Sequence, residues 1–225
     1  MIFAVGNLKG GVGKTTLAVN LAVAFALASR DVLLIDAEGT ALAFTDLRAS
    51  TQGEPGYTAV ALHGATIRTQ ARLLAPKYAD IVIDIGGEDA TGSIRAAFTV
   101  ADLVLIPVKP RSFDIWRTEQ TLELVNEARE INEGLRAVAV LNEADAQGAD
   151  NQATLDQLAE IPDLEVAPVV IGRRKAFPNA TAAGLSVLEY RADPKASDEM
   201  RQLVKFLSSP YVYTKAIGVA SNGNR

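Results

Sequence analysis

The sequence predicts an α/β fold: a doubly wound, mostly parallel sheet with helices on both faces. Three observations predict it. Short segments rich in Val, Ile and Leu are apolar almost throughout, which is typical of strands covered on both faces. Helix-like stretches alternate with these segments, which favours right-handed strand–helix–strand crossovers. A glycine-rich loop joins the first predicted strand to the first predicted helix.

The predicted strands differ in the strength of their pattern. Four segments carry it most clearly, at residues 2–6, 32–36, 81–84 and 103–108. Three more carry it more weakly, at residues 57–62, 137–141 and 166–171. Together they supply the sheet.

Three predicted helices lie between or after these strands, at residues 15–29, 116–132 and 196–207. The first is apolar all round and is expected to be well buried. The second is amphipathic, and Asp114 precedes it as a predicted N-terminal cap. Its apolar face is predicted to consist of Leu122, Leu124, Val125, Ala128 and Ile131.

Composition limits the function classes. Cysteine is absent, which excludes disulfides, thiolate-bound zinc and iron–sulfur clusters, and one histidine disfavours most Ser-His-Asp triads. The net charge of −5 argues against a uniformly basic nucleic-acid coat but not against a local basic patch. We expect a cytoplasmic protein without a signal peptide or membrane span. A single domain is predicted over residues 1–207, and the tail at 208–225 is expected to be poorly ordered.

The segment at residues 7–16 reads N-L-K-G-G-V-G-K-T-T and has the chemistry of a phosphate-binding loop. Its glycines let backbone N–H groups approach an anion, and the helix that follows adds its N-terminal dipole. Lys14 would supply a positive charge for the β and γ phosphates, and Thr15 a hydroxyl for Mg²⁺. The bland alternative is a glycine-rich turn that binds nothing.

The strict Walker A pattern fails here because its first glycine position is Leu8. The string K-G-G-x-G-K-T-T resembles instead the deviant Walker A loop of the ParA/MinD class of P-loop ATPases. The resemblance implies ATP and Mg²⁺ as cofactors, and a Lys9 that reaches the partner's nucleotide across a dimer and assists catalysis; the alternative for Lys9 is a solvated surface lysine. The nucleotide-binding residues it implies are Lys9, Gly10, Gly11, Val12, Gly13, Lys14, Thr15, Thr16 and Asn142.

Acidic residues end two of the predicted strands, as a magnesium-assisted hydrolase requires. The resemblance implies that Asp84 is the Walker B acid and that Asp36 supports the magnesium shell with Thr15. It also implies that Glu38 orients the attacking water. The family has Asp at the Glu38 position, so the longer side chain is a departure. A helix cap after a strand is the alternative for these acids. Gly86 and Gly87 resemble a switch segment that senses the γ phosphate; a flexible turn is the alternative.

Three further segments extend the resemblance across residues 1–207. Residues 106–116 resemble the strand–loop–helix segment that helps build the dimer face of small plasmid-partition ParA proteins. Asn142 occupies the position of an asparagine that binds adenine in related ATPases, with a turn-forming residue as the alternative. Residues 174–189 resemble the family's closing R-x-x-F … G-x-x-V-x-E segment. His63 is expected to be a surface residue without mechanistic weight.

The resemblance implies a ParA-type ATPase for DNA partition. MgATP would stabilise a sandwich homodimer that binds DNA non-specifically on the nucleoid, and a ParB-like centromere-binding partner would stimulate hydrolysis and release it. The predicted DNA-binding residues are Arg173, Arg174, Lys175, Arg191, Lys195, Arg201 and Lys205, with solvated helix faces as the alternative. Competing functions are a membrane-cycling MinD-like regulator, a metallocluster carrier and a small-molecule kinase or synthase. No membrane partner is expected.

Overall fold

The computed structural model describes residues 1–86, 91–110, 112–148 and 150–209, with the side chains of residues 112–117 excepted. Seven parallel strands form one sheet in the order β3-β2-β4-β1-β5-β6-β7. Their bounds are β1 Ile2–Val5, β2 Val32–Asp36, β3 Thr58–Ala61, β4 Asp80–Asp84, β5 Leu103–Val108, β6 Arg136–Ala144 and β7 Glu165–Gly172. The predicted fold class is confirmed.

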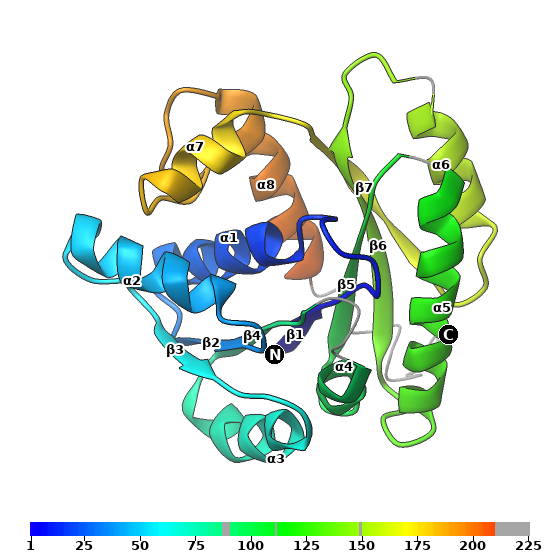
Figure 1. The fold of residues 1–225 in the computed structure, drawn as a ribbon, viewed down its shortest axis with the longest axis horizontal. Coiled ribbons are helices and arrows are strands. Elements are labelled where there is room, and N and C mark those ends of the chain that lie inside the picture. The colour runs from blue at the N-terminus through cyan, green and yellow to red at the C-terminus, as the bar shows by residue number, and fades with distance from the viewer. Residues whose placement is uncertain (87–90, 111, 149, 210–225) are drawn as a thin grey trace, which may run out of the picture.

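Helices cover both faces of the sheet (Figure 1). Their bounds are α1 Lys14–Leu27, α2 Thr40–Gln52, α3 Ala65–Leu74, α4 Thr91–Phe98, α5 Ser112–Arg129, α6 Asp150–Ala159, α7 Ala176–Ala182 and α8 Pro194–Leu207, with a 3-10 turn, η1, at Ala75–Lys77. One apolar core lies between the sheet and α1, α2, α7 and α8. The other lies under α3, α4, α5 and α6. No helix in the described ranges is long and apolar enough to span a membrane.

All seven predicted strands are present, with ends that differ from the prediction by at most three residues. Two details of the second predicted helix are wrong. Asp114 lies inside α5, which begins at Ser112, so it is not the residue before the helix. Ile131 follows the end of α5 and is 60% exposed, because the helix stops before its apolar face would reach that position. The predicted tail falls largely on residues 210–225, which lie outside the described residues.

An ion pair between a buried arginine and a half-buried glutamate joins α2 to the segment before α8. Arg48 is 6% exposed, and its guanidinium donates to both carboxylate oxygens of Glu189, at 2.8 and 2.9 Å. It also donates to the carbonyls of Pro55 and Gly184, at 2.9 and 3.0 Å. A buried charge is tolerated when it is paired and hydrogen-bonded in this way. The pair therefore ties the closing segment to the domain.

The strand order places the functional edge. β1 lies between β4 and β5, so the connections leaving it and its neighbours run to opposite sides of the sheet. In open α/β sheets the crevice outside the carboxyl ends of the strands at such a switch point is where ligands bind. The glycine-rich loop after β1 and the acids that end β2 and β4 meet at this edge.

Candidate nucleotide-binding site

The loop between β1 and α1 has a backbone that requires glycine. Gly11 and Gly13 have φ values of +69° and +90°, in the left-handed region. A Cβ at Gly13 would also lie 2.3 Å from Asn142 Nδ2, so the position has no room for a side chain. The Lys14 side chain is buried and its Nζ donates to the Lys9 carbonyl at 2.9 Å. The ammonium group is thus held over its own loop, where phosphate oxygens would bind.

Hydrogen bonds to two distant strands, β5 and β6, hold this loop in place. Asn7 Nδ2 donates to the Pro107 carbonyl at 2.9 Å, while Asn7 Oδ1 accepts from Lys9 N–H at 2.9 Å. Asn142 Nδ2 donates to the Val12 carbonyl at 2.7 Å. Asn142 therefore supports the phosphate loop directly, a role that sequence reasoning did not assign to it.

Asp84 is the acid best placed to hold a metal ion. It is 2% exposed at the end of β4, and the Thr15 hydroxyl donates a hydrogen bond to its carboxylate. Burial raises the pKa of this carboxyl to about 7; the charges of Asp36 and Glu38 add to the rise, while Thr15 and Lys14 oppose it. Among the described residues its Oδ1 has no hydrogen-bond partner. A buried oxygen without a partner, next to a hydroxyl, fits the oxygen donors that Mg²⁺ requires.

The lysine of the loop belongs to the same charge cluster. Burial lowers the pKa of the Lys14 ammonium, and the charges of Glu38 and Asp84 oppose that change. The described residues contain no group of three or more acidic, histidine or cysteine side chains that could hold a metal ion by themselves. Mg²⁺ in nucleotide sites is bound by one or two protein ligands together with phosphate oxygens and water, and Thr15 and Asp84 fit that scheme.

Asp36 organises the loop that follows β2. Its Oδ1 accepts from the N–H groups of Glu38 and Gly39, both at 2.8 Å, and its Oδ2 accepts from Leu42 N–H at 2.7 Å. The carboxylate thus binds the loop before α2 and one N–H of the first turn of that helix, although the residue at the N-cap position is Gly39. A place for Asp36 in the magnesium shell stays a prediction.

Glu38 and Gly86 lie against each other. A Cβ at Gly86 would lie 2.0 Å from Glu38 Oε1, so the glutamate side chain covers the backbone just after β4. The negative charge of Glu38 also acts to raise the pKa of both Asp84 and Lys14, which places it close to these residues. The structure therefore brings the predicted water-orienting acid to the phosphate loop. Gly87, the other predicted switch residue, lies outside the described residues.

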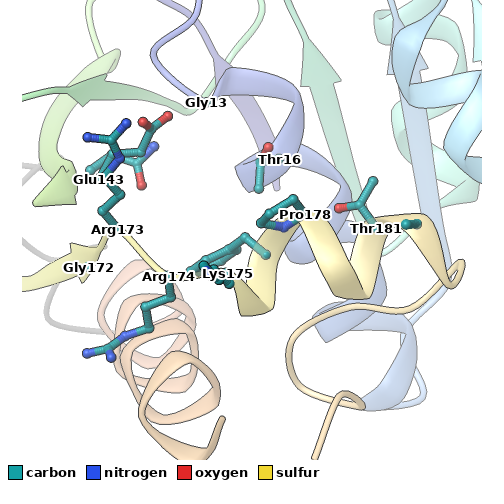
Figure 2. Close-up of a pocket in the computed structure, with 12 residues that line it drawn as sticks. Gly13, Thr16, Glu143, Gly172, Arg173, Arg174, Lys175, Pro178 and Thr181 are labelled. Atoms are coloured by element: carbon teal, nitrogen blue, oxygen red, sulfur yellow. The ribbon is translucent and has the colours of Figure 1, made fainter. Parts of the chain in front are cut away.

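A cavity of about 770 Å³ opens beside the loop (Figure 2). Gly13 and Thr16 form one side of it, and Asn142 and Glu143 from β6 another. The remaining lining residues come from the end of β7 and from α7: Gly172, Arg173, Arg174, Lys175, Phe177, Pro178, Thr181 and Ala182. Its position next to a phosphate loop suits the base and ribose of a nucleotide.

The cavity divides the predicted DNA-binding residues into two groups. Arg173, Arg174 and Lys175 line the cavity beside the phosphate loop, whereas Lys195, Arg201 and Lys205 lie on α8. Figure 2 shows Arg174 extending toward α8. There its Nε and Nη2 donate to the carboxylate of Glu199 at 2.9 and 2.5 Å, which raises the pKa of the guanidinium. Arg174 is thus committed within the fold.

Sequence reasoning missed two other residues at this edge. Glu143 lines the cavity, has a φ of +53°, and pairs with Lys109 Nζ at 2.8 Å. A non-glycine residue in the left-handed region is uncommon and often marks a functional edge. Its position directly after Asn142 was the only available signal. The other, His63, contacts the loop after β2, and no sequence pattern pointed to it.

Known proteins resemble this chain over most of its length. A family model described as the CobQ/CobB/MinD/ParA nucleotide binding domain matches residues 3–187. Maintenance of carboxysome distribution protein A of Halothiobacillus neapolitanus is 31% identical over 210 residues, covering 89% of this chain and 93% of that protein. Protein ParA of Rhizobium radiobacter is 29% identical over 132 residues, covering 57% of this chain and 58% of that protein.

A solved structure extends the comparison to the fold. The septum site-determining protein MinD of Pyrococcus horikoshii, complexed with Mg-ADP, matches with a TM-score of 0.74 at 17% identity, covering 97% of this chain and 99% of that one. At this identity the likeness concerns the fold alone. The matches confirm the predicted family and fold class, and the family model confirms a nucleotide-binding domain. The chain belongs to the CobQ/CobB/MinD/ParA family of nucleotide-binding domains, as a ParA/MinD-type P-loop ATPase.

Proposed function

We propose that the protein is a ParA-type positioning ATPase: MgATP drives it into a dimer that binds DNA without sequence preference, and partner-stimulated hydrolysis releases it. The observation that carries the proposal is the deviant loop itself, with Lys9 at its start and Lys14, Thr15, Asp84 and Glu38 gathered around it. A phosphate loop alone would serve many enzymes. The additional lysine at position 9 is what favours a two-subunit ATPase.

Each residue of the site has a defined part in this reaction. Bound Mg²⁺ would neutralise phosphate charge, and Thr15 and Asp84 would hold it. Lys14 binds the β and γ phosphates, because its ammonium already lies over the loop. Glu38 accepts a hydrogen bond from the attacking water and so orients it toward the γ phosphate. Asp36 keeps the Glu38 backbone in place through its hydrogen bonds.

The cavity beside the loop is the proposed site of the adenosine. Phe177 is 8% exposed and Pro178 lies next to it, so this wall offers an apolar surface to the base. Asn142 supplies an amide oxygen and a second amide hydrogen for the polar edge of adenine. Arg173 and Lys175 are exposed at the end of β7 and extend the positive surface toward the ribose and phosphates.

The proposed DNA-binding surface is α8. Lys195, Arg201 and Lys205 are exposed on this helix, and Arg191 is exposed just before it. Arg201 pairs with Asp198 at 2.9 Å, but both side chains are about 60% exposed, so the pair contributes little and leaves the guanidinium accessible to phosphate. A dimer would present the helix twice, and the resulting avidity would make DNA binding depend on ATP although α8 contributes no residue to the lining of the proposed adenosine cavity.

The cargo is the finer part of the proposal. The segregation of a plasmid or chromosome through a ParB-like partner is the reading that the deviant loop and the ParA relative support. A protein compartment is a second candidate, because the relative named for carboxysome distribution matches 89% of this chain. We propose the same ATP-dependent dimer on DNA for both cargoes, so the association with the nucleoid is part of the proposal in either case.

The decisive test compares three proteins in DNA binding with and without MgATP. The parent is expected to retain random-sequence duplex only with MgATP, with an affinity that falls steeply with salt. Replacing Lys195, Arg201 and Lys205 together by Glu should abolish retention and spare ATP-driven dimerisation. A matched control replaces three other basic residues by Glu and should retain DNA. These are Arg68, Arg72 and Lys77, which are exposed on the other face of the sheet. Equal retention by both triple variants would refute the α8 surface.

A second test addresses hydrolysis. Glu38→Ala is expected to bind ATP and to form the dimer while failing to turn over, so the variant should accumulate on DNA. Sedimentation velocity with ATP measures the dimer, and phosphate release measures turnover. Turnover equal to that of the parent would assign the water to another acid, Asp36 or Asp84.

A further inference from the structure

We propose that His63 is a positioning residue for ATP hydrolysis: its imidazole fixes the peptide between Ala37 and Glu38 and so sets the direction of the Glu38 side chain. The proposal rests on the role given to Glu38 above. The sequence had suggested no task for this residue, the single histidine of the chain.

The contact is direct. His63 Nδ1 lies 2.8 Å from the carbonyl oxygen of Ala37. A carbonyl oxygen only accepts hydrogen bonds, so Nδ1 carries the proton and donates it. His63 follows the edge strand β3, whereas Ala37 follows β2, so the bond joins the loops of two neighbouring strands.

The peptide that His63 binds is held from its other side as well. The N–H of Glu38, which belongs to the same peptide group, donates to Asp36 Oδ1 at 2.8 Å. The preceding N–H, that of Ala37, donates to the Asp84 carbonyl at 3.1 Å. Two side chains therefore define the plane of one peptide, Asp36 through its N–H and His63 through its C=O.

The orientation of this peptide matters because it leads directly into Glu38, and the peptide on the other side of Glu38 is held by Asp36 too, through the Gly39 N–H at 2.8 Å. Gly39 follows with a φ of +100°, a conformation that glycine adopts without strain but that allows wide variation. The Glu38 carboxylate lies against Gly86, where the space is tight enough to exclude a Cβ. A rotation of the peptide plane would displace the carboxylate from this position, and displacements of about 1 Å lower rates strongly in oriented reactions.

The backbone around His63 is itself supported. Gly64 N–H donates to Ser93 Oγ of α4 at 2.9 Å. Leu62 N–H donates to the Asp36 carbonyl at 3.1 Å. The imidazole is exposed, but it extends from a fixed backbone, so little conformational freedom is lost when it binds Ala37.

Three substitutions at this position separate the hydrogen bond from the rest of the side chain. Asn places its amide nitrogen where the imidazole has Nδ1, at the same number of bonds from Cβ, whereas Gln places it one bond farther and Ala removes it. We expect His63→Ala and His63→Gln to lower kcat about three- to tenfold, the effect of one hydrogen bond. His63→Asn should restore kcat to within about twofold of the parent. KM and the Kd of a non-hydrolysable ATP analogue should stay within about twofold in all three, because no phosphate or base contact changes.

Thr66→Val serves as the matched control. It removes the hydrogen bond that the Thr66 hydroxyl donates to the His63 carbonyl at 2.6 Å, but the N–H groups of Leu62 and Gly64 keep their bonds. The Ala37 carbonyl stays bonded to His63, so the kcat of this variant is expected to equal that of the parent. The melting temperature and analogue binding of each variant report its folding, and the comparison of Asn with Gln holds even where His63→Ala unfolds.

The outcomes are distinct. Equal kcat for His63→Ala and the parent, a failure of His63→Asn to restore kcat, or an equal loss in Thr66→Val would overturn the positioning role and leave the proposed ATPase function intact. A parent protein that binds ATP but never releases phosphate, with or without DNA, would overturn both. If the affinity for the ATP analogue falls as much as kcat, His63 is needed to fold the nucleotide site itself. That result would also overturn its positioning role.

Discussion

Replacing Asp84 by Asn should make the nucleotide-free protein more stable at alkaline pH while abolishing its use of Mg²⁺. The native pKa of Asp84, about 7, lies above the ordinary 3.8 of the carboxyl, with burial as the main cause. Between these values the native state binds more protons than the unfolded chain, so the free energy of unfolding falls as the pH rises. The two pKa values differ by roughly 3 units, and each unit lowers the free energy of unfolding by about 1.4 kcal/mol. The total loss of stability is therefore ~4 kcal/mol above pH 7.

The variant should avoid this cost. Asn is neutral at every pH and still accepts a hydrogen bond from Thr15, although a weaker one by about 1 kcal/mol. Urea denaturation without nucleotide or metal measures the difference between variant and parent. That difference should grow by about 2 kcal/mol between about pH 5.5 and about pH 8, because roughly 1.5 pH units of the interval lie above 5.5. A difference independent of pH would refute the assignment of a raised pKa to Asp84.

Three further substitutions test the remaining parts of the site. Lys14→Ala should weaken MgATP binding at least about tenfold in a calorimetric titration, because the phosphates lose their cation. Gly86→Ala should fold and bind ATP, but its Cβ would displace Glu38, so phosphate release should drop to the level of Glu38→Ala; turnover like that of the parent would contradict the contact. Lys9→Ala should bind nucleotide normally and lose partner-stimulated turnover. A stimulated rate equal to that of the parent would show that Lys9 has no part in catalysis and favour the alternative of a solvated surface lysine.

Most of the fold could be predicted from the sequence because buried parallel strands carry a strong local signal. β2 and β5 have the predicted bounds, and the loop before α1 was identified by its glycines and Lys14. The start of α5 was predicted wrongly because an acidic residue is favoured inside the first turn of a helix as well as at its N-cap, and Asp114 lies inside the first turn.

The candidate site was predictable only in part, because proximity along the chain does not give proximity in space. The sequence predicts Arg173 and Lys205 in one basic cluster, but Arg173 lies at the end of β7, beside the cavity, whereas Lys205 lies on α8, which contributes no residue to the cavity lining. The contact of His63 with Ala37 joins residues from two loops, and only the parallel pairing of β2 with β3 brings them together. Such tertiary contacts have no sequence pattern to find.

The central place of β1 in the sheet has a consequence for biosynthesis. The ribosome makes this strand before the other six strands of the sheet, yet its neighbours, β4 and β5, end at Asp84 and Val108. At about 5–20 residues per second, several seconds pass before β1 gains both hydrogen-bonding partners. The phosphate loop gains its full set of hydrogen bonds later still, because Asn142, whose side chain donates to the Val12 carbonyl, follows both strands in the sequence. Nascent chains that end before Asn142 thus lack a contact that holds the phosphate loop, and those that end before β5 expose an apolar edge of β1, a state that is prone to aggregation.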